Sequence, residues 1–453
     1  MKYSLFFVLI FYIVCPLEAT IGPGGHRSPS YTPATVDFSE SSSTEEKPTS
    51  SLRSIRENPL PPTDTNVLQR DLIQEDISPR TILENHQSYC DSCSDIRQFY
   101  NPTLIYITPW NNHGYDLAKI FTKKFDYVSP VWFRVKRQGY QIYVVEGKQD
   151  IDSLWIETLK TKNSDVRIVP RVSFEQWSAT DLHALFESED EKQHLASTLK
   201  DLLVDNTHLF DGFVLEILSQ FHGAPKATTH HLLSDIAEHI HAIQKTAHRK
   251  EVILAVPPLE EYFDRNDFNV LSEHLDGFHV MTYDFPTKEP GPVSPFRKFI
   301  LIFVVSKFFL FTIAWIKEVM RKFPQTRSDS SVKLFLGINF YGYRFDHIIP
   351  PPPKDRPQYH MNHIIGRDYI DFLKQYYPTA KIHFDARAHE HVTVVYTRSE
   401  ANVNRQAHYL PQIVIFYPSL KSIHDRFQLA MELNIGVAIW DGGQGFDYFF
   451  DLL

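Results

Sequence analysis

Carboxylate and aromatic side chains recur near the ends of short apolar runs in this sequence. The run FDGFVLEIL, residues 210–218, carries Asp211 and Glu216. The run MTYDF, residues 281–285, carries Tyr283 and Asp284, and GVAIW, residues 436–440, ends in Trp440. Sugars stack their flat apolar faces on Trp and Tyr rings, while carboxylates and amides bind their hydroxyl groups. These residue types therefore predict a carbohydrate-binding cleft.

Three further polar or aromatic residues end similar runs, namely Trp132, Asn339 and Tyr341. We expect them to line the same cleft. The alternative is that the aromatic side chains simply fill the hydrophobic core, as large rings commonly do. Several aromatic residues at run ends favour the cleft.

Eight strand-like runs alternate with helix-like segments from about residue 100 onward. The expected strands are Leu104–Pro109, Tyr127–Phe133, Val166–Ser173, Phe210–Ile217, Val252–Pro257, Gly277–Tyr283, Lys333–Tyr341 and Gly436–Trp440. The expected helices include Ala179–Asp205, His230–His248 and Ser419–Leu433. Eight βα units in series predict an α/β chain folded as a (β/α)8 TIM barrel. Functional residues of such barrels lie at the C-terminal ends of the strands.

Residues 343–418 are long for a single βα connection. They contain the strand-like stretches Val392–Tyr396 and Ile413–Tyr417. We therefore expect a small α+β insertion before the last barrel strand.

The first 85 residues differ in composition from the rest. Residues 1–19 are typical of a secretory signal peptide, with Lys2, an apolar stretch over 4–14 and a cleavage site at Ala19. Residues 20–85 are rich in Ser, Thr, Pro and Glu, which predicts a disordered linker. The folded domain is expected over residues 86–453.

Two cysteines remain after the signal peptide, Cys90 and Cys93. A CxxC pair can be a redox motif or half of a zinc site. In an exported protein, a local disulfide or a link to another chain is the favoured interpretation.

A second apolar run, FILIFVVSKFFLFTIAWI over residues 299–316, interrupts the barrel pattern. A membrane span there would divide the domain, so no span is expected. The run consists largely of Phe, Ile, Leu, Val and Lys, residue types that have AT-rich codons. We therefore hypothesise that residues 297–312 are a translated intron or a gene-model insertion. The alternative is a buried helix.

Charge and composition exclude several classes of protein. A net charge of −9 and a pI near 6.2 argue against a nucleic-acid-binding protein. His383, His389 and His391 lie close together in the sequence, but their spacing matches no zinc motif. We expect neither a metal nor another cofactor.

Several of these segments resemble the barrel motifs of glycoside hydrolase family 18, which contains chitinases and chitinase-like lectins. They are residues 210–218, 281–284, 337–342 and Trp440. The similarity runs from about residue 86 to the C-terminus and is interrupted around residues 297–312. It implies that Tyr283 and Asp284 hold a sugar in the central subsite and that Trp440 forms its floor.

The resemblance fails at the residue that catalysis requires. Active members read Asp-x-x-Asp-x-Asp-x-Glu on the fourth strand, and the corresponding residues here are Asp211, Val214, Glu216 and Leu218. The terminal Glu is the family's general acid, while the substrate's acetamido group is the nucleophile. Leucine cannot donate a proton, and losing a positioned acid costs on the order of 10²–10⁴-fold in rate.

Glu216 is a poor replacement for that acid. It faces the same side of the strand as position 218 but lies about 6.6 Å deeper, at roughly 3.3 Å per residue. We expect it to be a buried carboxylate paired inside the barrel, with Tyr283 as the suggested partner.

These observations predict a non-catalytic, chitinase-like protein, secreted or lysosomal, that binds chitooligosaccharides or related amino-sugar glycans. The alternatives are a weak glycoside hydrolase with a non-standard acid and a cargo protein with a vestigial cleft. Related proteins imply a sorting or scavenger receptor as a partner. The expected ligand-binding residues are Trp132, Asp211, Glu216, Tyr283, Asp284, Asn339, Tyr341 and Trp440.

Overall fold

The computed structural model describes residues 60–221, 224–243, 249–284, 290, 315–323, 332–348, 358–396 and 411–453. The chain divides into two units, residues 1–54 and 55–453. The first unit, with the expected signal peptide, lies outside the described residues.

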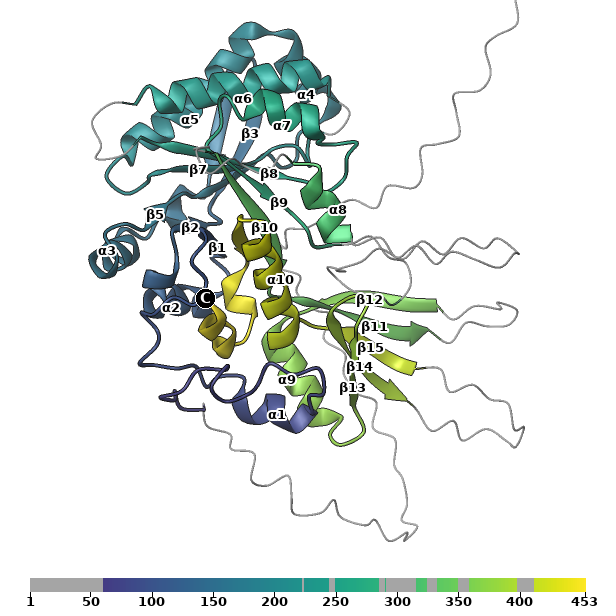
Figure 1. Ribbon diagram of the computed structural model, residues 1–453. Coiled ribbons are helices and arrows are strands. Elements are labelled where there is room, and N and C mark those ends of the chain that lie inside the picture. Colours follow the sequence, from purple (N-terminus) through teal and green to yellow (C-terminus); the bar gives the residue numbers. More distant parts are fainter. Residues whose placement is uncertain are drawn as a thin grey trace, which may run out of the picture. The chain divides into compact units, whose positions relative to one another are not determined.

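Parallel strands form a barrel (Figure 1). They are β1 (Thr103–Ile107), β2 (Tyr127–Pro130), β3 (Phe133–Gly139), β5 (Arg167–Ile168), β6 (Arg171–Ser173), β7 (Gly212–Glu216), β8 (Glu251–Val256), β9 (Gly277–Val280), β10 (Lys333–Asn339) and β16 (Gly436–Trp440). Strand β2 pairs with β5 and β3 with β6, so β2–β3 and β5–β6 are each one interrupted strand. Because β1 pairs with both β2 and β16, the ring closes. The eight expected strands are therefore confirmed, and so is the TIM barrel.

Helices surround the barrel, and α5, α6 and α7 lie over β7 and β8 in Figure 1. The helices are α2 (Asn112–Ile120), α3 (Ser153–Lys162), α4 (Ala179–Glu187), α5 (Glu189–Asp205), α6 (Lys226–His241), α7 (Arg265–Leu271), α8 (Trp315–Arg321) and α10 (Leu420–Glu432). The expected helix over 179–205 is two helices, because Ser188 ends α4 and caps α5 by accepting from the Glu191 amide. Short polar side chains favour such caps over helix interiors.

The apolar core has two layers. One lies between the sheet and the helices and includes Phe213 and Leu215 of β7. The other lies inside the barrel and includes Val214 of the same strand. This alternation follows from the two-residue period of a strand, and it directs Glu216 into the barrel.

The expected insertion before the last strand is present as a five-stranded antiparallel sheet, in the order β12-β11-β15-β14-β13. Its elements are β11 (Gly342–Ile348), β12 (Gln358–Ile364), α9 (Gly366–Gln375), β13 (Lys381–Asp385), β14 (Glu390–Tyr396) and β15 (Pro411–Phe416). On one face the Tyr369 hydroxyl of α9 lies 2.6 Å from that of Thr393. The two stretches expected to be strands are therefore confirmed as β14 and β15.

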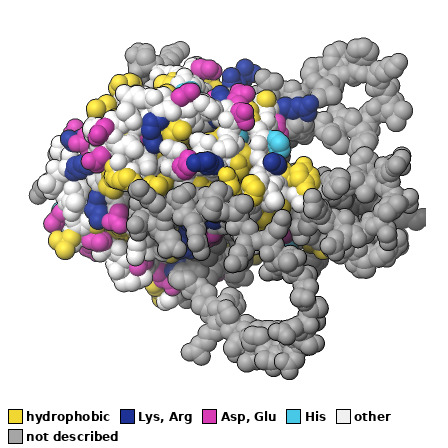
Figure 2. Space-filling view, turned by 90° about the horizontal axis from the view of Figure 1, so that it is seen from below, with side chains coloured by type: hydrophobic (Ala, Val, Ile, Leu, Met, Phe, Trp, Pro, Cys, Tyr) yellow, Lys and Arg dark blue, Asp and Glu magenta, His cyan; other side chains and the backbone are white. Residues whose placement is uncertain are grey.

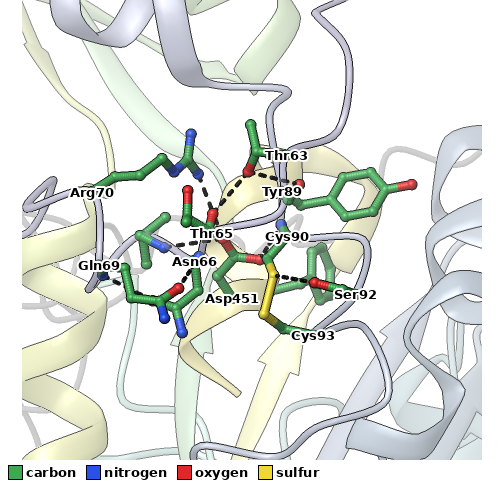
Figure 3. The surroundings of a disulfide bond; sticks show 12 residues. Thr63, Thr65, Asn66, Gln69, Arg70, Tyr89, Cys90, Ser92, Cys93 and Asp451 are labelled. Carbon is green, nitrogen blue, oxygen red and sulfur yellow. Dashed lines mark hydrogen bonds and ion pairs between the residues drawn. A yellow bond between two sulfur atoms is a disulfide. The ribbon is translucent and has the colours of Figure 1, made fainter.

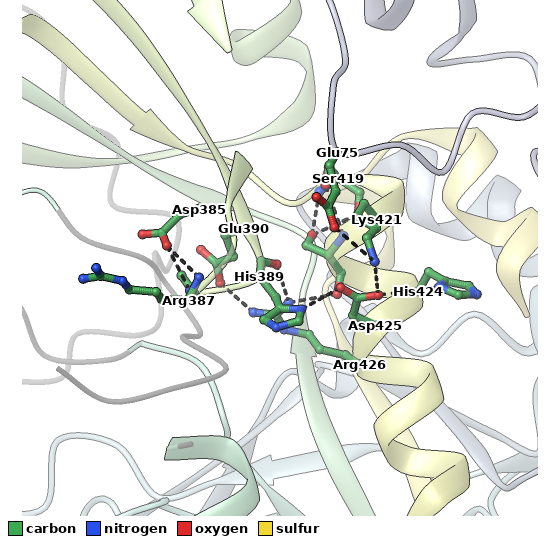
Figure 4. Close-up of polar contacts among 12 residues, drawn as sticks. Glu75, Asp385, Arg387, His389, Glu390, Ser419, Lys421, His424, Asp425 and Arg426 are labelled. Atoms are coloured by element: carbon green, nitrogen blue, oxygen red, sulfur yellow. Dashed lines mark hydrogen bonds and ion pairs between the residues drawn. The ribbon is translucent and has the colours of Figure 1, made fainter. Parts of the chain in front are cut away.

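Polar contacts join this insertion to α10 (Figure 4). The side chain of Asp425 binds His389 at 2.8 Å and Lys421 at 2.7 Å. The buried guanidinium of Arg426 binds Glu390 at 2.7 Å. Because His389 immediately precedes β14 and Glu390 begins it, whereas Asp425 and Arg426 belong to α10, these contacts fix the insertion against the barrel.

The segment before β1 is packed, although a linker was expected up to residue 85. It contains α1 (Pro79–Asn85), and Val67 is fully buried. Cys90 and Cys93 form a disulfide within this segment (Figure 3). The structure thus has the local bridge and not a link to another chain.

The second apolar run lies mostly outside the described residues, so the insertion hypothesis for 297–312 stays a prediction. Its last two residues, Trp315 and Ile316, begin α8 and are buried. None of the helices in the described ranges is long and apolar enough to cross a membrane. On the face shown in Figure 2, acidic and basic side chains are interspersed.

Candidate sugar-binding site at the barrel mouth

Trp440 ends β16 at the barrel mouth, and its side chain is half-buried. The ring of Tyr106, from β1, lies 4.9 Å from the Trp440 ring between centroids. The guanidinium carbon of Arg171, from β6, lies 5.5 Å from the same ring centroid. Trp440 therefore lies between an aromatic ring and an arginine, and its role as the floor of a sugar subsite stays a prediction.

Glu216 is paired inside the barrel as expected, but with a different partner. Its Oε2 accepts a hydrogen bond from Nε of Arg171 at 2.6 Å. The two side chains are 12% and 4% exposed, so the pair is almost wholly desolvated. The suggested pairing with Tyr283 is wrong, because Arg171 reaches the carboxylate from the neighbouring strand. Burial alone would lower the pKa of Arg171, but Glu216 and Glu175 raise it, so the guanidinium remains charged.

Tyr283 and Asp284 lie beside Tyr341, as the cleft hypothesis requires. Asp284 Oδ1 accepts from the hydroxyls of Tyr341 and Tyr343, the latter at 2.5 Å. Asp284 has a φ of 56°, a left-handed conformation that turns its carboxylate toward these tyrosines. Together with Trp440, these rings form an apolar cluster between the barrel and the insertion.

The Tyr283 hydroxyl is buried and has no hydrogen-bond partner among the described residues. Its pKa is well above the ordinary value because of burial and the neighbouring Tyr106 and Glu216. The hydroxyl therefore stays protonated and is available as a donor.

Below this layer, Tyr106 and His279 form a fully buried pair. The Tyr106 hydroxyl lies 2.7 Å from Nδ1 of His279. Burial lowers the pKa of His279 to about 3, so the ring is neutral. One hydrogen bond therefore joins the Tyr106 hydroxyl to Nδ1 of the neutral ring.

Leu218 lies outside the barrel interior. Strand β7 ends at Glu216, so the alternation of side-chain directions along the strand does not extend to position 218. Leu218 therefore need not face the same side as Glu216. Leu218 belongs to the apolar layer between sheet and helices. It lines a cavity of about 50 Å³ together with Lys226, His230 and Asp267.

The expectation that Trp132 lines the cleft is wrong. Its side chain is 3% exposed and belongs to the layer between sheet and helices. The indole N–H donates to the Tyr115 hydroxyl at 2.8 Å, and the Trp155 ring lies 6.2 Å away. The irregular backbone between β2 and β3 turns this residue outward.

Asp211 and Asn339 are both committed to structural contacts. Asp211 precedes β7, at the end of the barrel opposite the mouth, and binds the Ile168 amide at 2.9 Å and Lys160 at 3.1 Å. A ligand-binding role for Asp211 is therefore wrong. Asn339 lies beside Trp440 in register, but its amide donates to the Tyr341 carbonyl at 2.6 Å.

Asp441 is a mouth residue that the sequence did not single out for function. It follows Trp440 with a φ of 49°, and its Oδ2 accepts from the Thr108 hydroxyl at 2.8 Å. Burial raises its pKa to about 6.

Arg171 was also missed, although its sequence carries a signal. It is a charged residue within the strand-like run RIVPRVS, and charged residues are almost never buried unless they are paired. His279 and Tyr343 lack such a signal.

Metal-ligating residues come together at one place within the described ranges, where Glu189, His231 and Asp235 converge on α5 and α6. The amide of Gln193 already binds both carboxylates, at 3.3 and 3.2 Å. His389 and His391 are bound to Asp425 and Ser419, respectively.

Residues 102–445 match the family model described as glycosyl hydrolases family 18. Among solved structures, the chain is similar to a class V chitinase from Nicotiana tobaccum, with a TM-score of 0.58 and 14% identity over 78% of this chain and 97% of that one. A chitinase from Chromobacterium violaceum gives a TM-score of 0.55 and 17% identity, over 78% and 98% of the two chains.

A mutant chitinase from Cycas revoluta in complex with (GlcNAc)4 gives a TM-score of 0.55 and 16% identity, over 77% and 97% of the two chains. These structural similarities show that the chains share a fold.

Proposed function

The chain belongs to glycosyl hydrolases family 18, and from this premise we propose that it binds amino-sugar oligosaccharides without cleaving them. The ligand class is chitooligosaccharides or related glycans. The observation that carries the proposal is the state of the fourth strand, where Leu218 replaces the acid and Arg171 binds Glu216.

The lack of catalysis follows from proton chemistry. A general acid must hold a proton within reach of the leaving oxygen. Leu218 has none, and its side chain packs between sheet and helices. Glu216 accepts a hydrogen bond from Arg171 inside the barrel, so its carboxyl group is engaged by the neighbouring strand.

Binding is supported by the groups that remain at the mouth. Trp440 offers a ring for the apolar face of a sugar, and Tyr283 offers an unpartnered hydroxyl among the described residues. Asp284 is held by two tyrosine hydroxyls. The chitinase of Cycas revoluta, which shares the fold, was solved with (GlcNAc)4.

The test is a titration of tryptophan fluorescence with the N-acetylglucosamine tetramer, followed by mass spectrometry of the sugar. We expect saturable binding with the tetramer intact. Trp440→Ala, measured by calorimetry because this variant lacks the reporter ring, should weaken binding about tenfold or more, which corresponds to about 1.4 kcal/mol. Tyr100→Ala is the control, because this exposed ring precedes β1 at the opposite end of the barrel.

Each other result favours one alternative. Shortened sugar would mean that the missing acid has been replaced and that the protein is a hydrolase. An absence of binding would favour a cargo protein that acts through a receptor. Binding unchanged in Trp440→Ala would contradict a site at the mouth.

We further propose that the chain belongs to the branch of chitinase domain-containing protein 1, also called stabilin-interacting chitinase-like protein. The segments HQSYC (86–90) and YITPWNNHGYD (106–116) support this assignment. A secreted or lysosomal location and a sorting or scavenger receptor belong to the same proposal. The signal-like residues 1–19 and the Cys90–Cys93 disulfide support export. Immunofluorescence with a lysosomal marker, alongside assay of the medium, tests the location.

A further inference from the structure

Arg171 uses only part of its hydrogen-bonding capacity. A guanidinium carries five N–H groups, one on Nε and four on the two terminal nitrogens. The Nε group donates to Glu216 at 2.6 Å. The four terminal N–H groups have no hydrogen-bond acceptor within the part of the chain that the structure describes.

This arrangement resembles a prepared carboxylate receptor. Two parallel N–H groups of a guanidinium match the two oxygens of a carboxylate and bind it bidentately. Here Glu216 fixes the plane of Arg171 from the Nε side, and burial of the side chain to 4% exposure restricts its rotamers. The terminal fork is thus held in place before a ligand arrives, which lowers the entropy cost of binding.

The groups around Arg171 match the rest of an acidic sugar. The Trp440 ring, whose centroid is 5.5 Å from the guanidinium carbon, provides a surface for the sugar ring. The protonated Tyr283 hydroxyl is a second donor without a partner among the described residues. Donors therefore outnumber free acceptors beside the aromatic floor.

Nearby carboxylates already have partners of their own. Glu216 is bound to Arg171, Glu175 accepts from the Ser173 hydroxyl at 3.0 Å, and Asp284 accepts from two tyrosines. Their charges oppose long-range attraction of an anion. A preference for acidic sugars must therefore come from direct contact with the guanidinium.

We propose that the site selects amino-sugar oligosaccharides in which one sugar carries a carboxylate, and that the terminal nitrogens of Arg171 bind this group. The inference rests on the proposed sugar-binding function. It adds that the ligand carries a negative charge and that Arg171 recognises this charge.

Three tetrasaccharides test the proposal by calorimetry on the full chain. The first alternates N-acetylglucosamine with glucuronic acid, the second is the same compound with its carboxyl groups reduced to alcohols, and the third is the neutral N-acetylglucosamine tetramer. We expect the acidic compound to bind at least tenfold tighter than its reduced form. Arg171→Gln should abolish that ratio, and Arg171→Lys, which keeps the charge without the fork, should lose most of it.

Loss of the buried ion pair could itself unfold the protein, so matched variants are needed. Arg171→Gln combined with Glu216→Gln leaves no unpaired charge and should also lose the preference. Arg426→Gln breaks another buried arginine–glutamate pair, 2.7 Å long, in the contact between insertion and α10. That variant should retain the preference.

The outcomes separate the two proposals. Equal binding of the acidic and reduced compounds overturns the role of Arg171 but leaves sugar binding intact. An unchanged tenfold ratio in the double variant also overturns it. Failure of all three compounds to bind the unaltered protein overturns the proposed function itself.

Discussion

Two buried ionisable residues, Asp441 at the barrel mouth and His279 below it, have pKa values shifted in opposite directions. Burial raises the pKa of Asp441 to about 6 and lowers that of His279 to about 3. Both shifts favour the neutral form, because low polarity penalises charge. As the pH falls from about 6 to 4, the contribution of Asp441 to the free energy of unfolding therefore increases, whereas that of His279 decreases.

Asp441→Asn should remove one of these dependences. The folded pKa exceeds the usual value of 3.8, so the contribution of Asp441 to stability is full below about pH 4 and is lost as the pH rises through 6. The slope is about 1.4 kcal/mol per pH unit. Relative to the natural protein, the variant should thus gain about 2–3 kcal/mol in free energy of unfolding between pH 4 and 7. Asparagine also tolerates the left-handed backbone at this position.

Urea unfolding at both pH values measures this gain. Asp71→Asn serves as the control, since Asp71 has the same left-handed backbone conformation but an exposed side chain. If Asp441→Asn changed the free energy of unfolding by the same amount at pH 4 and pH 7, Asp441 would not be the group responsible for the pH dependence.

His279→Gln should remove the opposite dependence. The unfolded imidazole takes up a proton below about pH 6.5, whereas the folded one does so only near pH 3, so stability falls as the pH drops below 6.5. The amide oxygen of glutamine can still accept from Tyr106. We expect the variant to gain about 2 kcal/mol relative to the natural protein between pH 7 and 5.

Urea unfolding at pH 5 and pH 7 tests it, with the exposed His183→Gln as the control. An unchanged slope in His279→Gln would mean that this ring is not the acid-sensitive group.

The residues of the site could be predicted only in part. Tyr283, Asp284, Tyr341 and Trp440 come together as expected, because regular strands end there. Trp132 could not be placed, since it and the next residue both face outward across the β2–β3 irregularity. Both residues are apolar whichever way they face, so the sequence does not reveal that the alternation of side-chain directions is broken there.

At the scale of elements, strands were predicted well where they are buried on both faces. The barrel strands appear as continuous apolar runs, which is typical of parallel sheets. Strands β12 and β13, QYHMNHI and KIHFD, carry polar residues throughout and were missed. Each pairs with a strand adjacent in the sequence, β12 with β11 and β13 with β14. Their polar composition, and not a distant partner, therefore concealed them.

One glycine shows how closely β7 and β8 approach each other. Gly212 has a φ of 152°, and a Cβ built there would lie 1.9 Å from the Glu251 carbonyl oxygen. Gly212→Ala must therefore displace backbone, and we expect a loss of at least about 3 kcal/mol of stability. Gly139→Ala is the matched control, because its Cβ would meet only Ile142 at 3.8 Å.

Soluble yield and urea unfolding of the two variants compare these sites. Equal stability of both would show that the strands can separate freely at this point.

At the scale of the whole molecule, Asp451 connects the two ends of the packed chain (Figure 3). Its carboxylate, 1% exposed, accepts from the amides of Val67 at 3.1 Å and Cys90 at 2.9 Å. Arg70 lies 3.5 Å away as its counter-charge. One side chain thus holds the segment before β1 against the C-terminus.

Asp451→Asn should release that segment while the barrel stays folded. An amide offers one acceptor oxygen in place of two, so one backbone N–H loses its partner, which costs about 1–3 kcal/mol. Hydrogen exchange should accelerate at Val67 and Cys90 and stay unchanged in β7 and β8, whose amides are held by neighbouring strands. In the control, Asp447→Asn, the amides of Val67, Cys90, β7 and β8 should keep their exchange rates. The Asp447 carboxylate binds the His113 side chain and none of these amides. Uniform acceleration across β7 and β8 would instead mean that the segment and the barrel unfold as one unit, and that Asp451 contributes to the stability of both.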